Sequence, residues 1–377
     1  MTLRLLLKLV IIQLSGSTIF AQVGESCISK RTSQEGVCKI ESQCPFVINQ
    51  AKLGIKATLC GFHELVIPIV CCPDSNGRSI TTMRISEQKC ELYSTPITRK
   101  FSLITLDANP ETLTVITDNC TYNRVPLIVG GEPAELGEFP FMALVGFNTT
   151  ESPWKCGGTL ISERYVLTAA HCTFSSDSLI SSVPTKVRLG ELDLSSDNDG
   201  SQHMDYRVSS IIVYPDYNWP QVYNDIALLR LQTRVVFTRF IRPACLANSR
   251  FLKTGKPLAT GWGKTGFNDP YSDKLLKVSL EIFDNAICNR SYSNEEKLPN
   301  GIISSMLCVG EPRNSTDRKD TCEGDSGGPL IVARESNLCQ FYVIGITSLG
   351  KACGVSKIPA IYTRVSEYVS WIEEQIW

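Results

Sequence analysis

The chain has 377 residues, which exceeds one ordinary domain and suits a large domain with a small one beside it. Its 37 lysine and arginine residues nearly balance 38 aspartate and glutamate residues, so the charge favours neither nucleic acid nor an anionic membrane as a partner. Sixteen cysteines, an even number, favour an oxidising compartment in which they pair as disulfides.

Residues 1–21 have the pattern of a secretory signal peptide. A short basic start leads into the mostly apolar stretch 4–13, and small residues follow up to Ala21, after which we expect the cleavage. The apolar stretch carries Lys8 and is too short to span a membrane, and no later segment of the sequence reaches that length. We therefore expect a secreted, extracellular protein without a membrane anchor.

Residues 22–72 hold six cysteines in a segment too small to bury much of a core, so disulfides must hold it together. The neighbours Cys71 and Cys72 should not pair with each other, because adjacent Cα atoms lie about 3.8 Å apart and a disulfide needs roughly 4.4 Å or more. Spacing alone does not choose among the remaining pairings. A zinc module is the alternative, but the segment has no Cys-x2-Cys pair and His63 is its only histidine.

Residues 73–127 show little periodicity and much serine and threonine, which indicates a linker, partly ordered and tied down by Cys90 and Cys120. From residue 128 onward, short β-rich runs separated by turn residues predict an all-β barrel architecture. These runs are 142–147, 186–190, 207–213, 276–282 and 341–347. The final run, 366–377, has apolar residues at helical spacing behind Ser366, and predicts a C-terminal helix with that serine as its cap.

Three short motifs in this β-rich region carry His171, Asp225 and Ser326. A serine hydroxyl is a poor nucleophile at neutral pH, and it needs an imidazole to take its proton and a carboxylate to orient that imidazole. Taken singly, the three residues have ordinary structural interpretations: a turn serine, a hydrogen-bonded histidine and a capping aspartate. Together, in the order His, Asp, Ser, they predict a catalytic triad. We expect neither His63 nor His203 to be catalytic.

Several independent motifs make residues 128–377 resemble the chymotrypsin-like serine proteases. The motifs are Ile128-Val129-Gly130-Gly131, Cys156-Gly157-Gly158-Thr159-Leu160, Ala169-Ala170-His171-Cys172, Asp225-Ile226-Ala227-Leu228, Gly261-Trp262-Gly263 and Gly324-Asp325-Ser326-Gly327-Gly328-Pro329. The resemblance implies two β-barrels with the active site between them. It also implies that Ser326 attacks the substrate carbonyl, His171 acts as base and then acid, and Asp225 orients His171. The backbone N–H groups of Gly324 and Ser326 would form the oxyanion hole.

The resemblance further implies a specificity pocket with Asp320 at its base and Ser348, Gly350 and Ala360 around it. A carboxylate there would pair with an incoming arginine or lysine, so we expect cleavage after those residues. A solvated loop aspartate is the alternative interpretation of Asp320. Leu349 stands where many members have tryptophan, and Ala360 stands where trypsin-like enzymes usually have glycine. The extra methyl group should narrow the pocket and leaves the preference between arginine and lysine open.

In this family, cleavage before a residue such as Ile128 creates an amine that pairs with the carboxylate beside the nucleophile, here Asp325. The uncut chain would then be a zymogen. The residue before that bond is Leu127, and a cut after Arg124 would leave three extra residues on the amine. We therefore expect an upstream activating protease that accepts leucine.

Residues 22–72 resemble the clip domain of arthropod haemolymph proteases, and the whole arrangement is most similar to the Snake-like branch. The clip pairing would be Cys27–Cys71, Cys38–Cys60 and Cys44–Cys72. Such enzymes activate downstream protease zymogens in melanisation or Toll-ligand cascades, and serpins inhibit them. These partners and the haemolymph location are implied by the resemblance alone. A catalytically dead clip-domain adaptor is the alternative function, as is a chain whose main role is binding through its clip region.

The family bridges of the larger domain would be Cys156–Cys172, Cys288–Cys308 and Cys322–Cys353. Cys120 and Cys245 resemble the pair that joins light and heavy chains after activation, which leaves Cys90 and Cys339 to pair by elimination. Asn-x-Ser/Thr acceptors for glycans occur at Asn119, Asn148, Asn289 and Asn314.

An acidic loop suggests a calcium site, as in some relatives, although a solvated polar loop is the simpler interpretation. Its acids are Glu191, Asp193, Asp197, Asp199 and Asp205. No other metal and no cofactor is expected.

Overall fold

The structure is a computed structural model that describes residues 23, 25–29, 35–44, 47, 57–63, 67–73, 83–93, 99–104, 112–117, 132–148, 153–174, 183–248, 256–264, 269–311, 324–334, 337–350 and 358–377. The chain divides into two compact units, residues 1–82 and residues 83–377. Within the described ranges, no helix is long and apolar enough to cross a membrane.

The first unit is a small antiparallel sheet held by disulfides. Its strand order is β1-β2-β4-β3, and a 3-10 turn, η1, follows β2. The bounds are β1 Ser26–Ile28, β2 Glu35–Ile40, η1 Glu41–Gln43, β3 Leu59–His63 and β4 Ile67–Pro73. Its buried cluster includes Cys44, Val47, Val70 and Cys72, so half of these core residues are cysteines. A core this small needs covalent links, as the sequence predicted.

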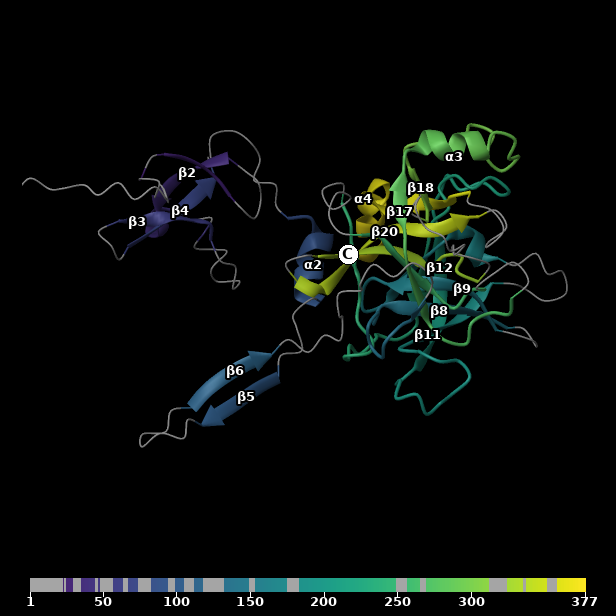
Figure 1. The fold of residues 1–377 in the computed structure, drawn as a ribbon, viewed down its shortest axis with the longest axis horizontal. Helices are drawn as coiled ribbons and strands as arrows, with labels where there is room; N and C mark the ends of the chain where they lie inside the picture. The colour runs from purple at the N-terminus through teal and green to yellow at the C-terminus, as the bar shows by residue number, and fades with distance from the viewer. Residues whose placement is uncertain are drawn as a thin grey trace, which may run out of the picture. The chain divides into compact units, whose positions relative to one another are not determined.

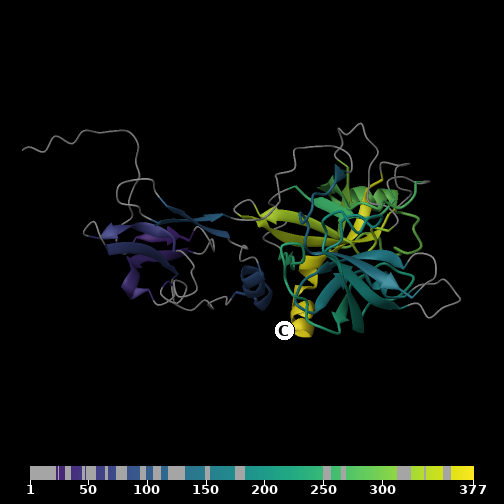
Figure 2. The ribbon, with the colours of Figure 1, turned by 90° about the horizontal axis from the view of Figure 1, so that it is seen from below.

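In the second unit, six of the described strands close into a barrel in the order β10-β13-β12-β11-β8-β9 (Figures 1 and 2). The bounds are β8 Met142–Phe147, β9 Trp154–Leu160, β10 Tyr165–Thr168, β11 Pro184–Leu189, β12 Met204–Val213 and β13 Ala227–Leu231. All six residues of β8 are buried, whereas β11 and β12 mix buried with exposed positions.

The second barrel is built from a nine-stranded sheet of the described residues, in the order β17-β18-β21-β20-β19-β15-β16-β7, with β14 parallel to β20. The bounds are β7 Glu132–Pro133, β14 Cys245–Leu246, β15 Leu258–Gly261, β16 Leu276–Ser279, β17 Glu281–Phe283, β18 Met306–Gly310, β19 Pro329–Arg334, β20 Asn337–Leu349 and β21 Ala360–Arg364. A separate hairpin pairs β5 (Arg99–Ile104) with β6 (Thr112–Thr117). The predicted all-β, double-barrel fold is confirmed.

The helices of the second unit are short. They are α2 Ile85–Tyr93, α3 Asn285–Ser291 and α4 Val369–Ile376, with 3-10 turns η2 Ala170–Thr173 and η4 Val365–Glu367. One apolar core runs between the two barrels, where Phe341 of β20 meets the rings of Phe139 and Phe141 at 5.7 and 5.3 Å. Val369 and Ile372 attach α4 to this core.

The predicted strand runs overlap observed strands, with one interruption. The run 276–282 breaks at Leu280, which is buried, into β16 and β17. The C-terminal helix exists, but its predicted serine cap is wrong. Ser366 lies in the preceding 3-10 turn, and α4 begins after Tyr368 without a side-chain cap.

Candidate active site

Strand register brings the first two residues of the predicted triad together. His171 lies in η2, just after β10, and Asp225 lies just before β13. These strands are antiparallel neighbours, and Thr168 at the end of β10 pairs with Ala227 at the start of β13. The segments that flank this pair therefore meet at the same edge of the first barrel.

The Asp225 carboxylate is fully buried and holds the histidine through two contacts. The backbone N–H of His171 donates to Oδ1 at 2.9 Å, and Nδ1 of its ring lies 2.7 Å from Oδ2. Ser348 donates its hydroxyl to the same Oδ2, and the Thr363 hydroxyl donates to the Asp225 carbonyl at 2.9 Å. Because its Nδ1 faces Asp225, the ring keeps Nε2 for another partner.

This pairing decides the protonation of both groups. Burial alone would raise the pKa of Asp225, but the charge and hydrogen bonds of His171 outweigh burial and hold this pKa below its usual value. Burial would lower the pKa of His171, but Asp225 outweighs burial and raises this pKa above its usual value. Lys297 acts against Asp225, since its positive charge lowers the pKa of His171.

Ser326 lies in a glycine-rich loop, residues 324–328, that leads into β19. Its carbonyl accepts a hydrogen bond from the N–H of Gly157 in β9 at 2.8 Å, so the loop reaches across to the first barrel. Gly327, the next residue, has φ 76°, and a Cβ there would lie 2.2 Å from Thr168 Oγ1 and 3.1 Å from Cys172 Sγ. The serine loop therefore lies directly against the segment that carries His171.

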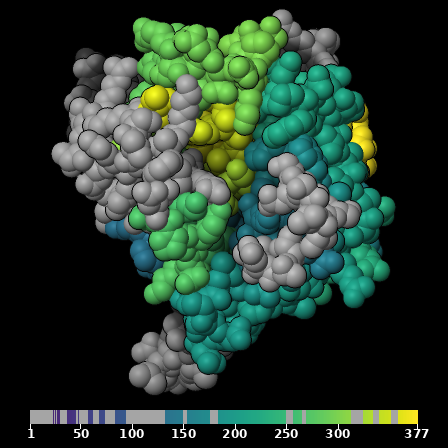
Figure 3. Space-filling view, turned by 90° about the vertical axis from the view of Figure 1, so that its right-hand side faces the viewer, coloured from purple at the N-terminus to yellow at the C-terminus, as the bar shows by residue number. Residues whose placement is uncertain are grey.

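One face of the protein is hollowed. In Figure 3, yellow segments from the C-terminal end of the chain lie recessed between green and teal segments, where the two barrels meet. Gly324 has φ 97°, a backbone conformation that side chains other than hydrogen rarely allow. A Cβ at Gly324 would lie 2.8 Å from the ring of Tyr271, which leaves no room for a larger residue at the proposed oxyanion hole.

Asp325 explains two glycines of the Gly-Trp-Gly motif. Its Oδ1 accepts a hydrogen bond from the N–H of Gly263 at 2.9 Å. A Cβ at Gly261 would lie 2.0 Å from that oxygen, and one at Gly263 would lie 2.5 Å from the carboxyl carbon. Both positions must be glycine because the carboxylate occupies the adjoining space.

The structure describes only part of the predicted specificity and activation residues. Ala360 begins β21 and is buried, and Gly350 is exposed after the end of β20. Ser348 is buried with its hydroxyl on Asp225, a role that the sequence analysis missed. Asp320, Leu127 and Ile128 lie outside the described residues, as do the acceptors Asn119 and Asn314 and the whole segment 1–21. Asn148 and Asn289 are exposed.

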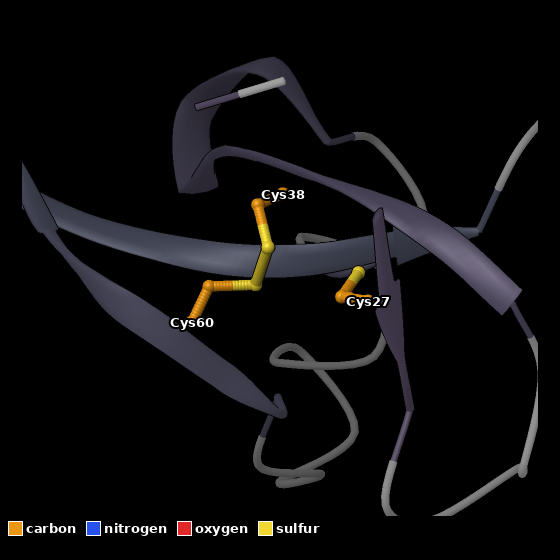
Figure 4. Close-up of side chains that lie close together, drawn as sticks. All are labelled: Cys27, Cys38 and Cys60. Carbon is orange, nitrogen blue, oxygen red and sulfur yellow. A yellow bond between two sulfur atoms is a disulfide. The ribbon is translucent and has the colours of Figure 1, made fainter. Parts of the chain in front are cut away.

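Five of the predicted disulfides are present: Cys27–Cys71, Cys38–Cys60, Cys44–Cys72, Cys156–Cys172 and Cys288–Cys308. Figure 4 shows the Cys38–Cys60 bond with Cys27 close to it. Because these three cysteines are disulfide-bonded, they offer no thiolate for the zinc site that was the alternative.

Two predicted pairs, Cys120–Cys245 and Cys90–Cys339, are wrong. Cys245 is bonded to Cys90, with Cα atoms 5.0 Å apart. Cys90 lies on α2, which packs beside β14, and this helix was not predicted. Cys120, Cys322 and Cys353, together with the Cys339 side chain, lie outside the described residues.

The acidic loop has a cationic partner in the preceding strand, Arg188 of β11. Its guanidinium contacts Asp205 at 2.7 and 3.2 Å and the buried Glu191 at 3.1 Å, and lies 4.9 Å from the ring of Trp154. Asp193 and Asp199 instead accept hydrogen bonds from nearby backbone N–H groups.

Calcium takes six to eight oxygens that converge on one point. Among the described residues, the clusters close enough to share a metal are two groups of disulfide-bonded cysteines, one of them including His171, and no carboxylates.

Comparison with known proteins agrees with this geometry. Residues 128–372 match the family model described as Trypsin. The chain is 36% identical to "Serine protease snk" of Drosophila melanogaster over 358 residues, covering 93% of this chain and 78% of that one. It is 32% identical to "CLIP domain-containing serine protease B4" of Anopheles gambiae over 398 residues, covering 99% and 98%. It is 39% identical to "Phenoloxidase-activating factor 3" of Holotrichia diomphalia over 265 residues, covering 66% and 72%.

The chain belongs to the clip-domain serine proteases. It is a trypsin-like serine endopeptidase, and the first unit occupies the position of the clip domain. The sequence prediction of this family is thereby confirmed.

Proposed function

We propose that this clip-domain protease is a secreted zymogen that is activated by cleavage between Leu127 and Ile128 and then cuts protein substrates after arginine or lysine. The observation that carries the catalytic part is the buried Asp225 carboxylate, which holds both the backbone N–H and the ring Nδ1 of His171 beside the serine loop. An adaptor without catalysis would not need this pairing of a buried charge with a half-buried imidazole.

The proposed reaction follows from the free ring nitrogen. Ser326 Oγ attacks the substrate carbonyl carbon while its proton passes to His171 Nε2, and the oxyanion is received by the N–H groups of Gly324 and Ser326. His171 then gives the proton to the leaving amine, and an acyl group stays on Ser326. Water repeats the sequence, losing a proton to His171 and releasing the acid. Asp225 stabilises the imidazolium in both halves.

Substrate selection would depend on Asp320, which would pair with the positive charge of the substrate. Ala360 supports a pocket narrower than that of glycine-containing relatives, since its buried methyl group takes up space. Leu349 is half-buried and packs against a cluster that includes Val222 and Ile361. We therefore expect the enzyme to discriminate between arginine and lysine more strongly than an enzyme with glycine at 360.

Activation would involve the Asp325 carboxylate, which occupies the space beside Gly261 and Gly263. A new amine at Ile128 would pair with this carboxylate, because a buried charge is stable only when it is paired. Since Leu127 precedes the bond, the activator must accept leucine, and the arginine-directed enzyme cannot activate itself there. The three clip bridges, Cys90–Cys245, Cys156–Cys172 and Cys288–Cys308 use twelve of the sixteen cysteines, and if Cys322 pairs with Cys353, then Cys120 and Cys339 remain for one another.

We also propose that loop 191–205 works without calcium, because Arg188 already forms ion pairs with both Glu191 and Asp205. The wider role rests on the relatives. One is named a phenoloxidase-activating factor and another is the protease snk, so we assign this chain to an extracellular protease cascade of immunity or development. Downstream substrates would be protease zymogens, and serpins would be inhibitors. The disulfides of the first unit suit an oxidising, extracellular location.

The test is to isolate the active form, sequence its heavy chain and profile it with a peptide library. We expect a heavy chain that starts at Ile128, labelling of Ser326 by an organophosphate, and cleavage after arginine or lysine. Ser326→Ala should lose at least about 10⁴-fold in kcat, since the triad acts as a unit. A heavy chain that starts at Val125 would overturn the activation site, and an unlabelled protein would favour the adaptor.

A further inference from the structure

The helix before the activation bond has one face pressed against the catalytic unit. In α2, Ser86, Cys90 and Tyr93 are buried, at the spacing that places side chains on one side of a helix. Gln88 and Leu92 lie outside this face and are exposed. Figures 1 and 2 show α2 beside α4, so two segments far apart in the sequence are neighbours here.

The start of this helix is held by a single carboxylate of α4. Glu373 accepts two hydrogen bonds from the Arg84 guanidinium, at 3.2 and 2.8 Å. It also accepts the backbone N–H of Ser86 at 3.1 Å and the Ser86 hydroxyl at 2.6 Å. The two parallel guanidinium contacts are charge-assisted, which makes them stronger than neutral hydrogen bonds. All four donors belong to the short segment 84–86, which precedes the proposed cleavage site.

The end of the helix is held by the first barrel. The Tyr93 hydroxyl donates to Glu163 at 2.6 Å, and its ring meets Phe237 edge to face, with centroids 5.3 Å apart. Tyr93 is buried, so the contact combines apolar burial with a satisfied hydroxyl. Between the two ends, Cys90 is bonded to Cys245, and Asn248 donates to Glu87.

Each of these contacts joins a residue before the proposed cleavage site to a residue after it. Residues 84–93 would belong to the light chain, whereas Glu163, Phe237, Cys245, Asn248 and Glu373 would belong to the heavy chain. Burial raises the pKa of Glu373, but Arg84 and Ser86 outweigh burial and bring this pKa below its usual value, so the carboxylate stays charged at neutral pH. Helix α2 is therefore held on the catalytic unit by an ion pair and hydrogen bonds in addition to the Cys90–Cys245 disulfide.

We propose that residues 84–93 form a noncovalent clamp that keeps the light chain, and with it the clip domain, on the catalytic domain after activation, even without a disulfide between the chains. This inference rests on the proposed cleavage between residues 127 and 128. It assigns Glu373 and Glu163 as a binding surface for the enzyme's own light chain. The active protease would then keep its clip domain through two independent attachments.

The experiment removes the covalent links and keeps the clamp. Cys90, Cys120, Cys245 and Cys339 are replaced by serine, so the light chain retains only cysteines that pair within the clip domain. Residues 123–127 are replaced by an enteropeptidase recognition sequence, so that the cut before Ile128 does not need the natural activator. This result therefore stands even if Leu127 proves not to be the natural site.

After the cut, we expect light and heavy chains to elute together in size-exclusion chromatography at micromolar concentration. Glu373→Gln in the same background should weaken their association about tenfold or more, because it removes a charge-assisted pair. Glu374→Gln is the matched control, since this neighbour is exposed, and it should change nothing. Separation of the chains in the parent protein, or equal behaviour of the two variants, would overturn the clamp.

A second measurement covers the case in which the four-serine protein does not fold. With all cysteines kept and the chain cut, a mild thiol should reduce Cys90–Cys245 faster in Glu373→Gln than in Glu374→Gln, because a loosened helix exposes the buried sulfur. Mass spectrometry after alkylation follows this one bond. Equal reduction rates would contradict the proposal.

Discussion

At the scale of single residues, two charges act on the pKa of His171 in opposite directions. Asp225 raises the pKa of this imidazole and Lys297 lowers it, with burial acting in the same direction as Lys297. As the proposed general base, His171 must be neutral to take the serine proton, so activity should fall as the pH drops through this raised pKa. The contribution of the His171–Asp225 ion pair to folding stability has the opposite pH dependence. It is fully present below the pKa that His171 has in the unfolded chain, and it is lost as the pH rises through the raised pKa of the folded protein.

Lys297→Gln should therefore move the acid limb of kcat/KM to higher pH, because it removes a charge that disfavours imidazolium. Lys256→Gln, a change at an exposed lysine before β15, is the control and should leave the limb in place. The measurement is a pH profile of kcat/KM on one peptide substrate with the cut enzyme. A limb that stays or moves to lower pH in Lys297→Gln would show that this lysine does not act on His171.

The residues of the proposed triad could be named from the sequence because each lies in a short local motif, whereas the residues that contact Asp225 from a distance could not. Ser348 and Thr363 contact Asp225 from 123 and 138 residues away, and nothing beside them in the sequence indicates such a partner. The same holds for Cys90, since cysteine spacing does not encode which distant strand a helix packs against. Residues within short motifs could be assigned from the sequence, whereas contacts and disulfides between distant residues could be predicted only where a family resemblance supplied them.

At the scale of elements, strands were easier to predict than helices. The run 142–147 is apolar and became the fully buried β8. Helix α2 buries only a serine, a cysteine and a tyrosine, so it has no apolar stripe for a sequence pattern to show. Its position is fixed by a disulfide and by carboxylates of other elements.

The loop between β11 and β12 gives a prediction at this scale. Arg188→Met removes the arginine that pairs with the buried Glu191 and leaves it only His203, 3.3 Å away. It should lower the free energy of unfolding by about 2 kcal/mol and the melting temperature by several degrees. Calorimetry of the purified protein measures both. Lys186→Met is the matched control, because Lys186 lies on the same strand and over the same Trp154 ring but is not among the ion-pair partners of Glu191 or Asp205 in the described residues.

Chelation by EDTA should leave the melting temperature of the unchanged protein where it is. If chelation instead lowers it as far as Arg188→Met does, the loop depends on a bound cation and the assignment of Arg188 as its internal charge is wrong.

At the scale of the whole molecule, the compact unit that contains the protease starts at Met83, well before the proposed activation bond. A protein that keeps residues 1–21 but lacks residues 22–82 should therefore retain the melting temperature of its catalytic unit. One that lacks residues 22–93 and carries Cys245→Ser loses both α2 and the Cys90 bridge. A long-loop disulfide contributes about 3–4 kcal/mol and each kcal/mol shifts a domain of this size by about 2–4 °C, so we expect a loss on the order of 10 °C.

A third protein separates the bridge from the helix. It lacks residues 22–82 and carries Cys90→Ser with Cys245→Ser, so α2 keeps its contacts with Glu373 and Glu163 but not its covalent link. Its melting temperature should fall between those of the other two, because the ion pair and the buried tyrosine still stabilise the unit. If the protein starting at Met83 and the one starting at Ser94 melt together, then α2 adds nothing to the catalytic unit, and the light chain is attached to the protease only as a passenger.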